Sequence, residues 1–523
     1  MTDRWTEAQL RKQLYWVLAL EWAGGTWYVS TAPLEILDGA DKITAIPGLV
    51  DVPDVEEALD LWATDQPTLS VALSFVLPVD VPALISKGHD LAGAKATLCQ
   101  HAYGDTWAER RVVVQGQLVD PEYDAAGEPI TCSVEEQISD DQTTLPFADV
   151  TINEATFQVG TGLITTLVDD HLGAVVPLVY GTPGGGVVPG SPAYLLGAGP
   201  TGVELIYVLA CHTVAAATVV LQAEDLTTSP AVPVSHWTLD DGRVVAYATV
   251  TTGFTASRDV RVLWGDGAAL ADETGEGIVG AGDLMAYILR RTTLRVDWGR
   301  LEGQRQQLNA YELGGYVDEP VAVGEYLRSV LLDVLPAGLV VGPEGVYPLV
   351  WRWAATTADA ICDLDTDVDV DVDRVSRVGY SGADEIASTI SLRYRLDARQ
   401  DDYSASQLIA PAPELTFDSL SSPEVQVSYA RFGDRRLSRE TAVVHDAVTA
   451  VRVVQWLAAR YALPARSVTY AVGPRLAWLQ RGDVVTLTDS EIAASSQVCI
   501  VESIRWLDDG GLGVTLRYVE RRG

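Results

Sequence analysis

The sequence predicts a multi-domain protein of the α+β class, mainly β with a few helices. Its 523 residues are enough for roughly three or four domains. Short runs of alternating polar and apolar residues recur along the chain, and this alternation gives a strand one buried and one solvated face. Helical periodicity is confined to a few segments that lie between the β-runs.

Alternation is clearest in two runs of the first half of the chain, residues 68–75 and 111–119. A turn at 124–127 then leads into residues 130–134, which predicts a hairpin with a short loop. Residues 243–251 and 256–264 repeat the strand pattern further along. Most of the first half is therefore expected to be β.

Three segments have helical character. Residues 441–461 are the clearest, because Val444, Val448, Val451, Val454, Leu457 and Tyr461 recur at steps of three and four and form one apolar stripe. Pro464 follows and stops the helix. A second helix is expected over 323–335, before Pro336, and a shorter one over 284–291.

Changes in composition divide the chain into four expected domains. These are an N-terminal β domain (1–165), a middle β domain inserted after it (166–282), a helix-plus-β domain (283–420) and a C-terminal domain with one long helix (421–523). The stretch 181–192 is rich in Gly and Pro and is expected to be a linker or long loop.

Acidic residues outnumber basic ones twofold, 72 against 36, which gives a formal net charge of −36. A surface this negative repels phosphate, so a protein that grips nucleic acid is disfavoured, as is docking on an anionic membrane. Residues 205–223 carry no formal charge. They contain His212, several Thr and Gln222, and are expected to be a buried strand or helix, so no stable membrane insertion is predicted.

The sharpest motif is Gly197-Ala-Gly199-Pro-Thr-Gly202, which matches GxGxxG and has acidic residues about 20 positions further on. It resembles the dinucleotide-binding turn of flavoprotein and nicotinamide oxidoreductases. The sequence after it predicts more antiparallel β-structure, whereas that fold alternates strands and helices. The match is therefore interpreted as a glycine-rich turn, and no cofactor is expected.

A ladder of aspartates alternates with other residues at Asp363, Asp365, Asp367, Asp369, Asp371 and Asp373. Strict alternation places six carboxylates on one face of a strand, with neighbours about 6–7 Å apart. Such charges repel one another, so the face is expected to contact solvent, arginines or cations. Val368 stands where a calcium-binding EF-hand needs glycine, so a solvated face is the main interpretation and cation contact the alternative.

Enzyme signatures are missing from the sequence, which contains neither HExxH nor GxSxG. The six histidines are scattered, so no catalytic residue is assigned and an enzyme is not expected. Paired carboxylates for glycoside cleavage stay open, because 72 acids guarantee chance pairs. Several tryptophans have the chemistry to stack on sugars, although packing is the simpler role for them: Trp22, Trp27, Trp298, Trp351, Trp353 and Trp478.

The last hundred residues form an informative series: an expected strand at 424–429, the helix at 441–461, and strands at 467–472, 479–487, 497–501 and 513–518. This series resembles the closing domain of baseplate hub proteins of tailed bacteriophages and phage-derived gene-transfer particles. The family's "l-x-x-GD-x-V" turn corresponds to Leu479–Val484. Residues 294–349 are similar in layout to the preceding hub region, and 173–181 resemble the "vPxvyG" stretch of tail-tip proteins.

The resemblance implies two tail-tube-like β-barrels per chain, each flanked by a helix, and a homotrimeric ring of pseudo-sixfold symmetry. Such a ring joins the tail tube to a central fibre or spike, contacts distal tail proteins and encloses the DNA channel. It also implies a structural virion protein at the tail tip, assembled in the host bacterial cytoplasm. Carboxylates on a channel wall repel passing DNA, which is consistent with the acidity.

Two other classes of function stay open at this stage. One is another tail-tip component, either a distal tail protein or a carbohydrate-binding adhesin. The other is a dinucleotide-dependent oxidoreductase that uses Gly197–Gly202. A bound flavin or nicotinamide would favour the oxidoreductase, and glycan binding through exposed tryptophans would favour the adhesin.

Overall fold

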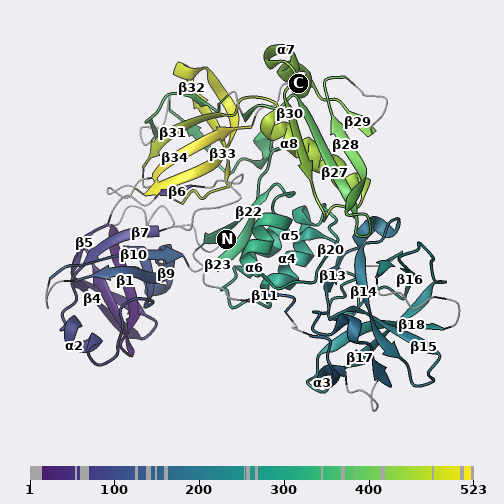
Figure 1. Cartoon of the computed structure of the whole chain (residues 1–523). Helices are drawn as coiled ribbons and strands as arrows, with labels where there is room; N and C mark the ends of the chain where they lie inside the picture. The colour runs from purple at the N-terminus through teal and green to yellow at the C-terminus, as the bar shows by residue number, and fades with distance from the viewer. Residues whose placement is uncertain are drawn as a thin grey trace.

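The computed structural model describes residues 14–519 except for 53–55, 59–69, 124–127, 137–142, 148–149, 158–162, 252–253, 255–258, 266–268, 343–344, 367–371, 383–384, 413–417, 474–475, 477 and 507–511. Within this part, β-strands in several separate sheets dominate and helices are few. The predicted fold class is confirmed. Figure 1 shows β-structures at the ends of the chain and in its middle, arranged around a helical centre.

The N-terminal barrel is a sheet of nine strands paired in the order β3–β4–β2–β1–β8–β9–β10–β7–β5. It closes at Gly48, whose N–H donates to the Ser30 carbonyl (3.0 Å) and whose carbonyl accepts from Val76 N–H (2.7 Å). A Cβ at Gly48 would lie 2.5 Å from the Val76 carbonyl oxygen, so the closure requires glycine. The strands are β1 (Leu14–Trp22), β2 (Gly25–Ser30), β3 (Leu34–Asp38), β4 (Asp41–Pro47), β5 (Leu49–Asp51), β7 (Ser70–Phe75), β8 (Lys95–Ala102), β9 (Arg111–Glu122) and β10 (Ile130–Glu136), with helix α2 (Val81–Ile85) between β7 and β8.

The middle barrel is fully closed, because β14 pairs with β15 on one side and with β19 on the other. Its strands are all antiparallel, and their inward side chains form a separate hydrophobic core around Trp264 and Tyr207. The segment 205–223, expected to be a buried strand or helix, supplies two of these strands. The strands are β14 (Ser191–Ala198), β15 (Glu204–Ala210), β16 (Thr218–Gln222), β17 (Val232–Thr238), β18 (Val244–Thr251) and β19 (Val260–Leu263), and β12 (Thr166–Leu167) adds to β14.

The C-terminal barrel follows the strand order β24–β32–β33–β34–β31–β25. The two ends of this order, β24 and β25, are consecutive strands in the sequence, so the pairing starts and finishes within one short stretch of chain. A strand from the N-terminal region, β6 (Glu56–Ala58), also pairs with β33. The other strands are β24 (Asp363–Asp365), β25 (Val372–Arg374), β26 (Gly379–Tyr380), β31 (Arg466–Val472), β32 (Val484–Asp489), β33 (Ala494–Trp506) and β34 (Leu512–Tyr518).

A four-stranded sheet next to this barrel is covered by the long helix α8 (Ala447–Tyr461), which packs on β27 and β28. Asp446 begins the helix, since its carboxylate accepts the N–H of Thr449 (2.8 Å). The predicted helix is confirmed, although it begins six residues later than expected. The sheet comprises β27 (Thr389–Asp397), β28 (Asp402–Ile409), β29 (Asp418–Leu420) and β30 (Arg436–Glu440).

The expected strand at 424–429 is wrong, because these residues lie in helix α7 (Pro423–Phe432). The Ser422 hydroxyl accepts the N–H of Val425 (3.2 Å), and Pro423 occupies the first helical position. Both are helix-start signals. Val425 and Ser428 are the buried positions of the helix, and their spacing of three residues matches one helix face.

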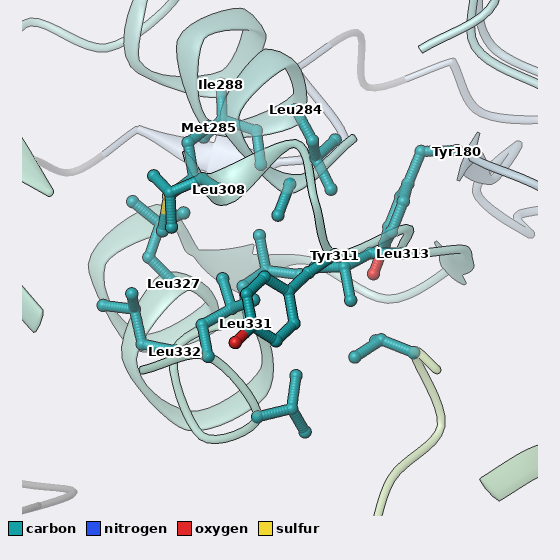
Figure 2. Close-up of a cluster of buried hydrophobic side chains, with 14 of the residues drawn as sticks. Tyr180, Leu284, Met285, Ile288, Leu308, Tyr311, Leu313, Leu327, Leu331 and Leu332 are labelled. Carbon is teal, nitrogen blue, oxygen red and sulfur yellow. The ribbon is translucent and has the colours of Figure 1, made fainter. Parts of the chain in front are cut away.

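The centre of the molecule is a bundle of short helices with a hairpin (Figure 1), and Figure 2 shows part of its hydrophobic core. Leu284, Met285 and Ile288 of α4 pack toward Leu308 of α5 and toward Leu327 and Leu331. The helix expected at 323–335 is a short α-helix followed by a π-helical turn. The elements are α4 (Ala281–Leu289), α5 (Trp298–Leu308), α6 (Val323–Tyr326), the π-turn Leu327–Leu331, β22 (Ala337–Gly342) and β23 (Gly345–Val350).

Smaller elements connect these parts. Two short strand pairs tie distant segments to the centre, β11 (Thr144–Leu145) with β21 (Val321–Ala322) and β13 (Leu178–Tyr180) with β20 (Gly315–Val317). The remaining helical elements are α3 (Glu154–Phe157) and the 3-10 turns Trp107–Glu109, Asp169–His171, Pro183–Gly186, Thr357–Asp359 and Ser490–Ile492. None of the described helices has the length and apolar character needed to cross a bilayer.

Candidate functional site

The N-terminal and C-terminal barrels are joined through β6 and β33. The two strands pair antiparallel, with Ser503 opposite Ala58 and Arg505 opposite Glu56. Because β6 lies between β5 and β7 in the chain, a loop of the first barrel supplies a strand to the second. Backbone pairing of this kind fixes two β-domains to each other in one register.

Arg111 at the start of β9 strengthens this junction. Its guanidinium lies over the ring of Trp506 in β33, with 3.8 Å from the guanidinium carbon to the ring centroid. Its Nη2 donates to the Leu479 carbonyl (3.3 Å). Stacking of a guanidinium on indole adds cation–π attraction to the apolar contact.

Buried apolar residues also connect the two barrels. A single hydrophobic cluster contains Leu18, Leu98 and Phe75 of the first barrel together with Tyr470 and Leu516 of the second. Burial of apolar area contributes about 25 cal/mol per Å². The two barrels therefore share one core, and the residue pattern of either barrel alone did not predict this.

The glycine–aspartate turn in the C-terminal barrel lies against the central hairpin. Gly482 has φ +79° and its N–H donates to the Val501 carbonyl (2.8 Å), while the carboxylate of Asp483 accepts the N–H of Gln480 (2.9 Å). A Cβ at Gly482 would lie 2.7 Å from Leu349. This turn therefore requires a small residue for its conformation and for its contact with β23.

The aspartate ladder is divided between β24 and β25, the first and last strands in the pairing order of the C-terminal barrel. Asp363 and Asp365 lie in β24 and Asp373 lies in β25, whereas Asp367, Asp369 and Asp371 lie outside the described residues. Leu364 is fully buried and Val372 is 3% exposed. The predicted alternation holds within each of these strands, with apolar residues inward and Asp363 and Asp373 exposed, but the described aspartates lie on two strands and not on one.

Cation binding at this ladder stays a prediction. The Asp363 carboxylate accepts a hydrogen bond from the Thr486 hydroxyl (2.7 Å). Nearby, Arg374 bonds to Asp489 (3.0 Å) and to Glu491. Among the residues that the structure describes, no group of three or more His, Cys, Asp or Glu side chains could hold a metal ion.

The three motif glycines lie at a β-hairpin of the middle barrel. Gly197 is in β14, and the turn through Gly199 and Gly202 leads directly into β15. A Cβ at Gly197 would lie 1.8 Å from the Thr166 carbonyl oxygen of β12. The glycine thus permits close approach of a neighbouring strand, and a helix N-terminus, which a pyrophosphate would need, does not follow the motif.

Two histidines, the buried His445 and the half-buried His212, are held neutral and have both ring nitrogens bonded to backbone groups. His445 Nδ1 accepts the N–H of Gly184 (3.0 Å), and its Nε2 donates to the Gly314 carbonyl (2.7 Å). His212 Nε2 accepts the N–H of Val179 (3.1 Å), and its Nδ1 donates to the Thr213 carbonyl (2.9 Å). Burial lowers the pKa of each imidazole from 6.5 to about 4. Both rings connect segments that are distant in the sequence.

The tryptophans considered for sugar stacking lie in different surroundings. Trp22 and Trp351 are buried, with 5% and 7% exposure. Trp298 is 41% exposed and has the Arg290 guanidinium 5.3 Å from its ring. The others, Trp27, Trp353 and Trp478, are half-buried.

Sequence comparison identifies one matching protein family. Residues 349–501 match the sequence model of a family described as "putative phage tail protein". The match begins at Leu349 and includes the Gly482 turn that contacts it. A comparison with curated protein sequences finds no significant match.

Three solved structures with similarity to the chain are tail or virion proteins. A tail protein from Neisseria meningitidis MC58 has 8% identity and a TM-score of 0.37, with 96% of each chain covered. The 43 kDa tail protein of prophage MuSo2 from Shewanella oneidensis has 11% identity and a TM-score of 0.32, with 96% of this chain and 98% of that one covered. A chain of the native gene transfer agent virion has 14% identity and a TM-score of 0.33, with 61% and 78% covered.

Proposed function

We propose that the chain is a structural protein of a phage tail and that it acts as the baseplate hub. The observation that carries this proposal is the family match over 349–501, a region that includes β24, β31 and β32 of the C-terminal barrel. This barrel is paired with a second one in the same chain through β6 and β33. Two paired barrels in one polypeptide suit a protein that connects a threefold assembly to a sixfold tube.

The pairing of barrels explains how a trimer would fit a sixfold tube. Three copies with two barrels each would form a ring of six similar β-units around one axis. The closed sheets leave few free edges, so the copies would contact one another through barrel surfaces. One face of this ring would contact tube and distal tail proteins, and the other a fibre or spike.

The charge of the chain suits a DNA passage. A net charge of −36 disfavours binding of phosphate groups, and an acidic lumen would let DNA pass without adhering to it. The exposed aspartates Asp363 and Asp373 belong to the barrel that would line such a ring. A structural role at the tail tip of the virion, without catalysis, follows from this proposal.

Size-exclusion chromatography with multi-angle light scattering on the purified chain tests the oligomeric state. One chain has a mass of 56.2 kDa, so the trimer is expected near three times that value at micromolar concentration. Class averages from electron microscopy should then show a ring with six peripheral densities. A stable 56.2 kDa species across that concentration range would contradict the proposal, since interfaces of about 1,600 Å² hold under these conditions.

A further inference from the structure

A cavity of 340 Å³ lies where the centre, the four-stranded sheet and the C-terminal barrel meet. Its walls come from five separate parts of the chain: the segment after β23, the end of β28, the start of α7, the end of α8 with the residues after it, and the end of β34. Junctions of this kind are common places for ligand sites, and the volume suits a small organic group.

One part of the cavity wall is apolar. Trp351 and Trp353 lie near Ile409, Leu463 and Pro464. Trp351 is 7% exposed and Leu463 is 9% exposed, so the surrounding packing holds these side chains in place. An aromatic or branched aliphatic group bound against this wall would remove apolar surface from water, and this burial would stabilise the complex.

Another part of the wall is cationic. Arg460 of α8 and Arg517 of β34 both line the cavity. The Arg517 side chain is 8% exposed and pairs with Glu502 (2.8 Å). Burial and the nearby Arg517 cation lower the pKa of Arg460 to about 10, and the guanidinium is still charged at neutral pH. An anion bound between the two guanidiniums would reduce their mutual repulsion and accept charge-assisted hydrogen bonds from both.

Glu424 limits the charge that such an anion can carry. It stands in the first turn of α7 and lines the same cavity. The carboxylates of Glu424 and Glu502 would repel a doubly charged ligand group such as a phosphate ester. A ligand with one carboxylate would be repelled less and could still accept hydrogen bonds from the planar guanidinium of Arg460. The cavity therefore favours monoanions over phosphate esters.

We infer that this cavity binds a carboxylate attached to an apolar body. The carboxylate contacts Arg460 and Arg517, and the apolar body lies against Trp351 and Trp353. Two sources share this chemistry, a free organic acid and the C-terminal carboxylate of a peptide. The inference concerns one copy of the chain and does not depend on the ring.

Titration calorimetry on the full chain tests the site with two matched pairs of probes. The first pair is 4-phenylbutyrate and its neutral amide, and the second is acetyl-Ala-Phe with a free or an amidated C-terminus. Each acid is expected to bind about tenfold or more tightly than its amide, because a charge-assisted hydrogen bond is lost in the amide. Phenyl phosphate is expected to bind more weakly than 4-phenylbutyrate.

Two substitutions should shift the affinity in opposite directions. Arg460→Gln is expected to weaken binding of the acid about tenfold, and Glu424→Gln to tighten it about threefold, because they remove attraction and repulsion respectively. Arg436→Gln is the matched control, since Arg436 is exposed and pairs with Asp434 elsewhere. Should Arg460→Gln not fold, the sign of the Glu424→Gln effect decides.

Every outcome bears on the inference. Binding of phenylbutyrate alone identifies the source as a free acid, and tighter binding of the peptide acid identifies a protein C-terminus. Equal affinity for acid and amide, no heat from either probe, or weaker binding by Glu424→Gln would overturn the site.

Discussion

His445 lies where three parts of the chain meet. Its ring connects Gly184, in the turn that precedes the middle barrel, with Gly314, which precedes β20. Its own carbonyl accepts a hydrogen bond from Arg395 Nε of β27 (2.9 Å). The close approach of these segments depends on glycine, because a Cβ at Gly314 would lie 2.8 Å from the Thr182 nitrogen and 3.1 Å from the His445 ring.

The buried, neutral His445 predicts a loss of stability in mild acid. The unfolded chain binds a proton at His445 below about pH 6.5, whereas the folded chain does not bind it until the pKa of about 4. The free energy of unfolding should therefore fall as pH drops through this window. For His445 alone the expected fall between pH 7.5 and pH 5 is about 2 kcal/mol.

Denaturant unfolding of His445→Gln at several pH values measures this contribution. The variant should be less stable than the parent at pH 7.5, yet its stability should fall about 2 kcal/mol less between pH 7.5 and pH 5. His89→Gln, at an exposed position, serves as the matched histidine control. An unchanged pH dependence in His445→Gln would contradict the assignment.

At the scale of elements, α8 shows how a local signal and burial act together. Val453, Val454 and Leu457 are buried on one face of the helix, whereas Val448, which the apolar spacing placed on the same stripe, is 60% exposed. Asp446 fixes the start of the helix, because its carboxylate accepts the N–H of Thr449. This N–H lies in the first turn and has no acceptor within the helix. The residues before it, which the apolar spacing assigned to the helix, instead connect β30 to α8 through His445.

Removal of the cap should destabilise the protein measurably. Asp446→Ala is expected to lower the free energy of unfolding by about 1 kcal/mol, because one helical N–H loses its acceptor. Asp446→Ser keeps an oxygen acceptor and should lose less than half of that amount. Guanidinium unfolding followed by far-UV circular dichroism measures both variants. Equal losses in the two would show that capping is not the cause.

Helix α7 shows where sequence patterning misleads. Glu424-Val-Gln-Val-Ser-Tyr429 alternates polar and apolar residues as a half-buried strand does. Ser422 and Pro423 before it carry the helix-start signal, which is local and independent of the alternation. Over so short a segment the cap outweighs the alternation, because burial of only Val425 and Ser428 is enough to attach the helix.

At the scale of the whole molecule, Arg399 connects the middle barrel to the four-stranded sheet. It lies in the turn between β27 and β28, and its guanidinium donates to the Gln222 carbonyl (2.8 Å) and side chain (3.1 Å). It also pairs with Asp259 (3.6 Å), and its side chain is only 10% exposed. The segment 181–192, expected to be a linker or long loop, is largely buried beside this contact and includes the start of β14.

Loss of Arg399 should loosen the middle barrel without unfolding it. In Arg399→Ala, the amides of Gly185, Val187 and Gly190 are expected to exchange with solvent about tenfold faster, because the junction opens more often. Hydrogen–deuterium exchange with mass spectrometry measures this change. Arg436→Ala, which removes an exposed pair, serves as the control. Unchanged exchange in Arg399→Ala would mean that other contacts hold the junction.

The sequence by itself determined the β-rich class, most strands of the three barrels and the long helix, because alternation and periodicity report which face of each element is buried. It also determined the charge and the outward direction of Asp363 and Asp373. Only the tertiary structure decided that β6 joins the second barrel, that Arg111 stacks on Trp506, and that Arg460 and Arg517 meet in one cavity. These contacts join residues far apart in the chain, and local patterns carry no information about which distant surfaces pack together.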